Sequence, residues 1–164
     1  MSHTGVLSVL LPTLGRMDQT LAAVVIVALL ALAAAVGVVW RQGNSRVSTE
    51  THPDQVPARF RSPDATLTLL QISAPLCSYC GAMRGILGDI AQAEPRAAHL
   101  EWDVSDATEL VDRFGIRQTP TTLLVSASGD VISRLQGATP AAVVKTQVAD
   151  AFTEIQRRAD EYRI

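Results

Sequence analysis

Cys77 and Cys80 are the residues whose type and spacing are best suited to chemistry, and they are the only two cysteines in the 164-residue chain. A disulfide scaffold joins distant segments, which a single close pair cannot do. A structural zinc site normally takes four ligands, and the three histidines are scattered without ligand spacing. The pattern therefore predicts a thiol–disulfide redox pair and no metal site. Two inert buried thiols, or a metal bound across a dimer, are the alternatives.

The neighbouring segments place this pair where a strand ends and a helix begins. Thr66–Ser73 is apolar and β-branched, which predicts a strand. Cys80–Ala93 carries apolar residues at helical spacing and stops ahead of Pro95, because the residue before a proline resists the helical conformation. The free N–H groups and the dipole of a helix N-terminus stabilise a thiolate. Cys77 is therefore the expected nucleophile, and Cys80 the shielded resolving thiol.

The remaining pattern predicts an α/β fold with a mixed sheet of four to five strands and flanking helices. A strand–helix–strand unit pairs in parallel, whereas a hairpin adds antiparallel strands. Further elements are expected as follows: a strand Ala98–Val104, a helix capped by Ser105 or Asp106 that runs through Phe114 to a stop at Gly115, strands Thr121–Ser126 and Val131–Gln136, and a helix from Thr139-Pro140 to about Arg158.

Residues Leu21–Trp40 form an uncharged apolar run before this domain. As a helix, such a run spans roughly 30 Å, the hydrocarbon thickness of a bilayer. It is longer than the apolar core of a cleaved signal peptide, so we expect a retained transmembrane anchor. The chain then divides into an N-terminal extension (1–20), the anchor (21–40), a proline-containing linker (41–65) with a short strand around 45–48, a domain (66–158) and a tail (159–164).

The charges flanking the anchor bear on its orientation. Arg41 and Arg46 follow it closely, whereas Arg16 precedes it. The positive-inside rule favours a cytoplasmic C-terminal domain, with the opposite face still possible. Met17 is an alternative start that would remove Arg16 from the count. The net charge of −2 shows no excess of basic residues for binding phosphates, so we expect no nucleic-acid partner.

The run from Thr66 to about Ala149 resembles a thioredoxin-like domain. The Cys77-Ser78-Tyr79-Cys80 motif matches the family's active-site pair, and Gly115–Thr121 resembles its segment with a cis-proline beside that pair. The resemblance implies that Pro120 is cis. With the preceding apolar run, the chain is similar to membrane-tethered thioredoxin-like proteins of actinobacterial type. The resemblance also implies the residues that contact substrate: Leu76, Thr119, Pro120 and Gly137.

Departures from the family pattern concern proton handling and redox potential. The family's buried aspartate corresponds to Gln71, which cannot titrate, and its neighbouring lysine corresponds to Glu101. With Gln71 and Glu101 at these two positions, we expect proton transfer at the second thiol to differ from that of the family and to run through water or through Glu101. Ser78-Tyr79 replaces the usual Gly-Pro, and Leu76 replaces a tryptophan. Because the enclosed dipeptide helps to set the reduction potential, the direction of electron flow stays open.

The resemblance implies an enzyme in which Cys77 attacks a protein disulfide, Cys80 resolves the mixed disulfide, and a partner protein restores the pair. No metal or organic cofactor is expected. The alternatives are a thioredoxin-fold binding or chaperone module with little turnover, and a dithiol oxidase or isomerase. Outside the motif, we expect His99 on the strand surface and Trp102 in the core. The carboxylates Asp103, Asp106, Glu109 and Asp112 are expected to cap a helix and face solvent.

Overall fold

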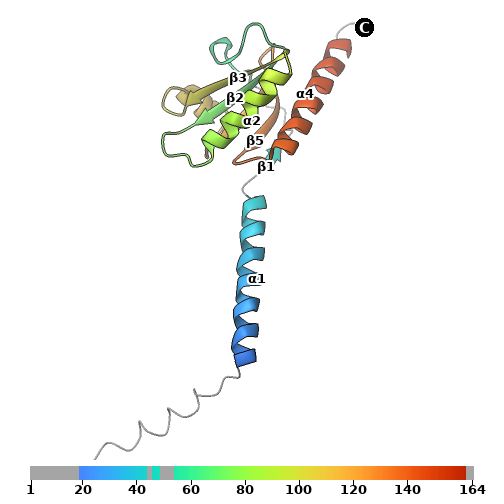
Figure 1. The fold of residues 1–164 in the computed structure, drawn as a ribbon. Coiled ribbons are helices and arrows are strands. Elements are labelled where there is room, and N and C mark those ends of the chain that lie inside the picture. Colours follow the sequence, from blue (N-terminus) through green and yellow to red (C-terminus); the bar gives the residue numbers. More distant parts are fainter. Residues whose placement is uncertain (1–18, 44–45, 49–53, 162–164) are drawn as a thin grey trace, which may run out of the picture. The chain divides into compact units, whose positions relative to one another are not determined.

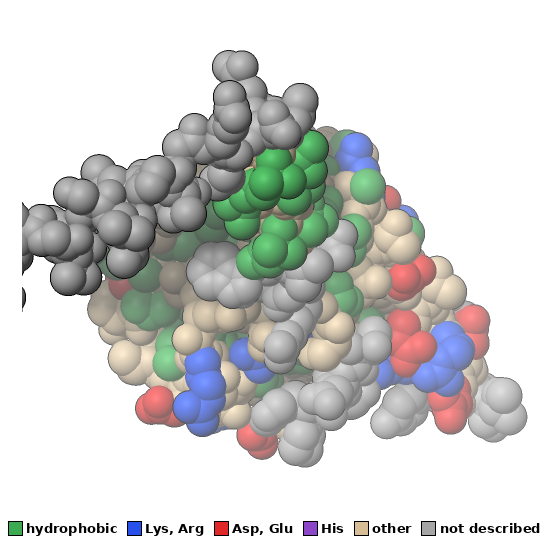
Figure 2. Space-filling view, turned by 90° about the horizontal axis from the view of Figure 1, so that it is seen from below, with side chains coloured by type: hydrophobic (Ala, Val, Ile, Leu, Met, Phe, Trp, Pro, Cys, Tyr) green, Lys and Arg blue, Asp and Glu red, His purple; other side chains and the backbone are tan. Residues whose placement is uncertain are grey.

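The computed structural model describes residues 19–43, 46–48 and 54–161 (Figure 1). The chain divides near Arg41 into two compact units. In the first, helix α1 (Gln19–Gly43) contains the apolar window Leu21–Val38, none of which is buried. Most of its described side chains are large, apolar and exposed, and in the end-on view they gather as a hydrophobic patch (Figure 2). By length and composition, α1 is able to cross a membrane. The expected extension 1–20 lies almost wholly outside the described residues, as does Met17.

The second unit is a mixed five-stranded sheet flanked by helices, in the strand order β1-β5-β4-β2-β3. This confirms the predicted fold class. Its strands are β1 (Arg46–Ser48), β2 (Leu67–Ser73), β3 (Ala97–Asp103), β4 (Thr121–Ser126) and β5 (Val131–Gln136). Its helices are the 3-10 turn η1 (Ala58–Phe60), α2 (Cys80–Ala93), α3 (Thr108–Arg113) and α4 (Ala141–Glu161).

The pairing of β2 sets the topology of the sheet. β2 runs parallel to β3 after the α2 crossover and antiparallel to β4, which pairs with β5 through the hairpin. In register, Gln71 stands beside Glu101 on β3 and beside Thr122 on β4. Residues that stand opposite each other on neighbouring strands point their side chains to the same face, so these three lie on one face of the sheet.

Two apolar layers cover the sheet. Leu67 and Leu69 of β2 pack under α2 and α4, which lie on the same face (Figure 1). Leu70 and Ile72 point to the other face, toward α3 and Phe60. The alternation of β2 therefore divides the core in two. Gln71 belongs to the α2 face, directly below the N-terminal turn of that helix.

The prediction of a linker over 41–65 is wrong for its C-terminal half. The short strand is present as β1, paired with β5. Beyond it, Val56 and Phe60 are buried in the domain core, and the Val56 N–H donates a 2.8 Å hydrogen bond to the carbonyl of Gly129. Gly129 has a φ of +101°, and a Cβ there would lie 2.9 Å from the Val56 carbonyl oxygen. Single apolar residues between prolines have no periodicity, so the sequence does not reveal this docking.

The two expected side-chain caps are also absent. α3 begins at Thr108 without a side-chain cap, because the Asp103 carboxylate instead accepts hydrogen bonds from the N–H and hydroxyl of Ser105. α4 begins at Ala141, and the buried Thr139 hydroxyl has no hydrogen-bond partner among the described residues. The expected glycine stop after α3 is confirmed, since Gly115 has a φ of +55°.

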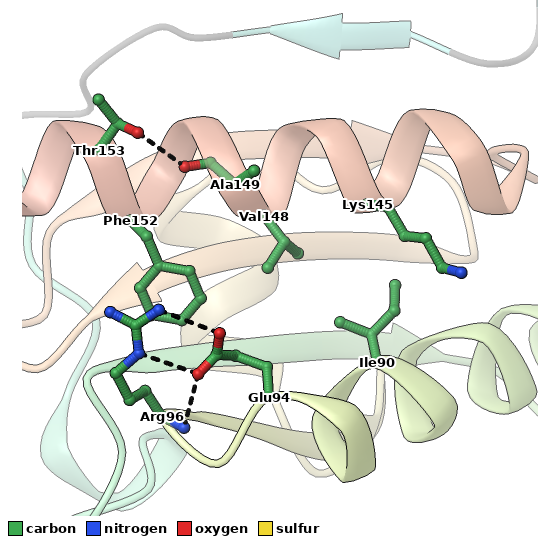
Figure 3. A pocket seen from close by; sticks show the side chains of 8 residues that line it. All are labelled: Ile90, Glu94, Arg96, Lys145, Val148, Ala149, Phe152 and Thr153. Atoms are coloured by element: carbon green, nitrogen blue, oxygen red, sulfur yellow. Dashed lines mark hydrogen bonds and ion pairs between the residues drawn. The ribbon is translucent and has the colours of Figure 1, made fainter.

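A shallow pocket of about 420 Å³ lies between the C-terminal end of α2 and α4 (Figure 3). The Arg96 guanidinium stacks on the Phe152 ring at 4.3 Å from its centroid and pairs with Glu94. Hydrogen bonds from Arg96 lower the pKa of Glu94. α2 is about 20 Å long, so this pocket is remote from the cysteines at its other end.

Candidate functional site

The cysteine pair lies at the junction of β2 and α2, as the sequence predicts. Between the two elements the chain turns twice: the Cys77 N–H donates to the Ala74 carbonyl at 3.2 Å, and the Cys80 N–H donates to the Cys77 carbonyl at 3.3 Å. Cys77 and Cys80 are joined by a disulfide, with their Cα atoms 5.5 Å apart. The structure is therefore that of the oxidised form.

The two cysteines differ in accessibility. Cys80 is 4% exposed, on the buried side of the first turn of α2, whereas Cys77 is half-buried before the helix. Leu76 is 97% exposed and Tyr79 is 60% exposed. An incoming sulfur atom reaches Cys77 more easily than Cys80, and the exposed Leu76 and Tyr79 lie within two residues of Cys77 in the chain.

The segment expected to carry a cis-proline does so, because the Thr119–Pro120 peptide bond is cis. Pro120 is buried and Thr119 is half-buried. The Pro120 carbonyl accepts a 2.8 Å hydrogen bond from the N–H of Gly137, which has a φ of +75° at the end of β5. The structure thus brings Pro120 and Gly137 together.

A second contact joins this part of the sheet to α2. After Gly137 the chain reaches Thr139, whose N–H points to the Met83 sulfur at 3.4 Å. Met83 lies one turn after Cys80 and is buried. The turn between β5 and α4 therefore contacts both the cis-proline segment and the N-terminal half of α2.

Gln71 contacts Cys80 from beneath. It is fully buried, and its Nε2 donates a 3.0 Å hydrogen bond to the Cys80 carbonyl and lies 3.4 Å from Glu101 Oε1. The Gln71 Oε1 faces His99 Nε2 at 3.2 Å. Because an amide oxygen only accepts, His99 must carry a hydrogen on Nε2 and donate it. The amide is thereby held from both sides.

Arg84 closes this network on its exposed side. It lies one turn after Cys80 on α2 and forms an ion pair with Glu101, including a 2.8 Å hydrogen bond from its second terminal nitrogen. The hydrogen bonds from Arg84 lower the pKa of Glu101 and outweigh its partial burial. Glu101 is thus a carboxylate at neutral pH, and acts there as an acceptor rather than as a proton donor.

Sequence reasoning missed two members of this network. His99 was expected on the strand surface, but it is half-buried against Gln71, and burial lowers its pKa. For Arg84 the sequence offers one indication of a role near the cysteines, which is its position one helical turn after Cys80.

Trp102 is half-buried with its ring edge against Phe60, as expected of a core residue. Within the described residues no three His, Cys, Asp or Glu side chains are grouped so as to hold a metal ion.

The site thus combines a reversible two-thiol pair, one accessible sulfur, and a buried polar network behind the second cysteine. Such a pair exchanges disulfides by thiolate attack through a mixed disulfide. The cis-proline segment is joined to α2 through the turn after β5, by the hydrogen bond from Gly137 to Pro120 and the contact of Thr139 with Met83.

Several known proteins are similar to this chain. A family model described as "Thioredoxin" matches residues 47–150. No curated protein matches the chain. Solved structures with a similar fold include a thioredoxin from Nicotiana alata (20% identity, 52% of this chain and 73% of that one, TM-score 0.47). Another is the germline-specific thioredoxin Deadhead of Drosophila melanogaster (25% identity, 56% and 87%, TM-score 0.49).

The family model covers more than half of the chain and includes the cysteine pair, the cis-proline segment and all strands of the sheet except the first residue of β1. A thioredoxin domain with a close cysteine pair fits a thiol–disulfide oxidoreductase in general. The chain belongs to the thioredoxin family.

Proposed function

We propose that this chain is a membrane-tethered thiol–disulfide oxidoreductase that reduces protein disulfides. The observation that supports it most is the unequal exposure of the Cys77–Cys80 pair at the N-terminus of α2. The accessible sulfur belongs to the cysteine that precedes the helix, where the dipole and free N–H groups favour a thiolate.

In the proposed cycle, the Cys77 thiolate of the reduced form attacks one sulfur of a substrate disulfide. That bond breaks, its other sulfur leaves as a thiolate and takes a proton, and a mixed disulfide forms at Cys77. The Cys80 thiolate then attacks the Cys77 sulfur and releases the second substrate thiol. Two electrons have passed to the substrate, and the Cys77–Cys80 disulfide remains. A partner dithiol protein restores the pair by the reverse exchange.

Gln71 and Glu101 are proposed to act on Cys80 rather than on substrate. Among the described residues, the side chain that hydrogen-bonds to the Cys80 backbone is the neutral amide of Gln71, in the place where a titratable group is expected. We infer that Gln71 holds the Cys80 backbone and that Glu101 fixes the Gln71 amide. The proton of Cys80 then exchanges with water or substrate. Substrate contacts are proposed for Leu76, Thr119, Pro120 and Gly137.

The tether is proposed to be α1, with the domain on the cytoplasmic side. The length and apolar surface of α1 support the span, and Arg41 supports the orientation. Protease protection of the full chain in sealed vesicles of known orientation tests both. Cleavage of the domain only from the cytoplasmic face is the expected result, and cleavage only from the other face contradicts the orientation. Release by carbonate washing contradicts the span.

The enzymatic proposal is tested by reduction of insulin disulfides with the full chain in detergent micelles, using dithiothreitol as the electron source. The expected result is acceleration that depends on Cys77 and is abolished by Cys77→Ser. Equal behaviour of the two proteins, in this assay and in dithiol oxidation, would instead support a binding or chaperone module.

The direction of electron flow is tested by the reduction potential of the pair. A potential near that of thioredoxin, about −270 mV, supports the proposed reductase. A potential near that of a strong oxidant, about −120 mV, contradicts it and indicates a dithiol oxidase.

A further inference from the structure

The outer edge of β3 is open. β3 is the last strand of the sheet, and among the residues that the structure describes no strand pairs with its outer side. It is seven residues long, with no proline or lysine and no break in its register with β2. The opposite edge is β1, with only three residues. Proteins usually protect an edge strand with charged side chains, above all lysine, or with proline, a bulge or short length. β3 has no lysine, proline or bulge and is not short, and its carboxylates Glu101 and Asp103 already accept hydrogen bonds from Arg84 and Ser105.

The backbone groups on this edge follow from the pairing with β2. The Leu67 N–H donates to the Arg96 carbonyl, and the Val104 N–H donates to the Ser73 carbonyl. In a parallel ladder, alternate residues of one strand direct both backbone groups to the same neighbour. The even-numbered residues of β3 therefore face β2. The odd-numbered residues direct theirs outward.

Turns at both ends already use some of the outward groups. The Ala97 N–H donates to the Glu94 carbonyl, and the Asp103 carbonyl accepts from the Asp106 and Ala107 N–H groups. The outward donors that remain are the N–H groups of His99, Glu101 and Asp103. The outward acceptors that remain are the carbonyls of Ala97, His99 and Glu101.

This set of groups is self-complementary about a two-fold axis through Leu100. In an antiparallel pair centred there, His99 faces Glu101 of the second copy, and the two residues exchange both hydrogen bonds. The free Asp103 N–H meets the free Ala97 carbonyl. The groups left facing each other are the Ala97 N–H and the Asp103 carbonyl, which the turns already satisfy.

The side chains fit the same register. Leu100 and Trp102 are only half-buried, although they pack on the core of their own chain. In the two-fold pair, Leu100 meets Leu100 of the second copy, and Trp102 stands opposite the small Ala98. On the other face, the Glu101 carboxylate stands opposite His99, so no like charges face each other. Cross-strand pairs of these kinds stabilise antiparallel sheets.

We propose that β3 pairs with β3 of a second copy of this chain, antiparallel and centred on Leu100, to form a continuous ten-stranded sheet. The interface covers His99 and Glu101, which contact the Gln71 amide behind Cys80. Dimerisation therefore places the second copy beside two members of the polar network of the redox site. The proposal does not depend on the proposed activity, because it rests on the edge of β3 alone.

Two measurements on the full chain in detergent micelles test it. Sedimentation equilibrium of the unmodified protein is expected to give the mass of two chains. Oxidative crosslinking is then performed on a Cys77→Ser/Cys80→Ser background. Leu100→Cys places two cysteines at a pair with Cα atoms roughly 4.5 Å apart, within the range of a disulfide. It is expected to crosslink at least about tenfold more than Ala98→Cys, whose two copies lie about 13 Å apart.

A mixed experiment tests the register. Chains with Ala98→Cys and chains with Trp102→Cys are expected to crosslink when combined, and neither is expected to do so alone. A monomeric mass overturns the proposal, and so does equal crosslinking of Leu100→Cys and Ala98→Cys, which would assign dimerisation to α1. A monomer that binds an extended peptide along β3 would instead make this edge a docking site for client strands.

Discussion

The side-chain amide of Gln71 donates a hydrogen bond of 3.0 Å to the backbone carbonyl of Cys80. The donor is fully buried, and its other contacts are His99 and Glu101. A neutral amide therefore lies beneath the second thiol, where the family resemblance leads one to expect a carboxyl group. This contact links the sheet to the redox pair.

Gln71→Glu is expected to make folding stability depend on pH. The carboxyl group would be buried beside the Cys80 carbonyl and the Glu101 carboxylate, so its folded-state pKa is raised. A raised folded pKa means that the native state binds the extra proton. Stability then falls as pH rises from the unfolded-state pKa, about 4.3, through the raised folded pKa. Urea denaturation of the full chain in micelles between pH 4 and pH 9 measures the effect.

Gln71→Met is the matched control, because it removes the hydrogen bonds without adding a titratable group. It is expected to cost about 1–3 kcal/mol, from the lost amide hydrogen bonds and from the half-buried His99 Nε2–H left without its acceptor, with no added pH dependence. If the stabilities of Gln71→Glu and Gln71→Met change in parallel with pH, the side chain at position 71 is not buried beside Cys80 and Glu101.

Arg84→Ala is expected to raise the pKa of Glu101. In the native protein the hydrogen bonds from Arg84 lower it. A lowered folded pKa contributes stability that is present above the unfolded pKa and is lost as pH falls through the folded value. The variant should therefore lose less stability on acidification. Carbon-detected NMR titration of the Glu101 carboxyl measures the shift directly, and Arg84→Lys should give an intermediate value. An unchanged titration would show that the ion pair does not form in solution.

Gly129→Ala is expected to destabilise the domain by more than about 1 kcal/mol, since a side chain there is strained and meets the Val56 carbonyl. Gly85→Ala is the control, because nothing lies within 4 Å of a Cβ at that helical position. It should stabilise by about 0.5–1 kcal/mol. Chemical denaturation compares the two. Equal effects would argue against docking of the segment around Val56 on the β4–β5 hairpin.

The local sequence pattern was sufficient to predict the strand before the cysteine pair and the helix after it. The apolar periodicity of Cys80–Ala93 predicted α2 with its observed bounds, and the strands of the hairpin followed from their turn. The docking of Phe60 and the contact between His99 and Gln71 join residues that are distant in the chain. Such contacts depend on strand register and packing, which periodicity does not encode. The expected cap failed for a different, local reason: the Asp103–Ser105 turn competed with it for the same hydrogen-bonding groups.

The assignment of Cys77 as the attacking thiol and of Cys80 as the resolving thiol underlies the proposed cycle. Its most direct test is trapping of the mixed disulfide with the full chain in its membrane, followed by alkylation and mass spectrometry. Cys80→Ser lacks the resolving thiol and is expected to accumulate disulfide-linked client proteins through Cys77, whereas Cys77→Ser is expected to trap almost none. The opposite pattern, or equal trapping by the two variants, would contradict the assignment.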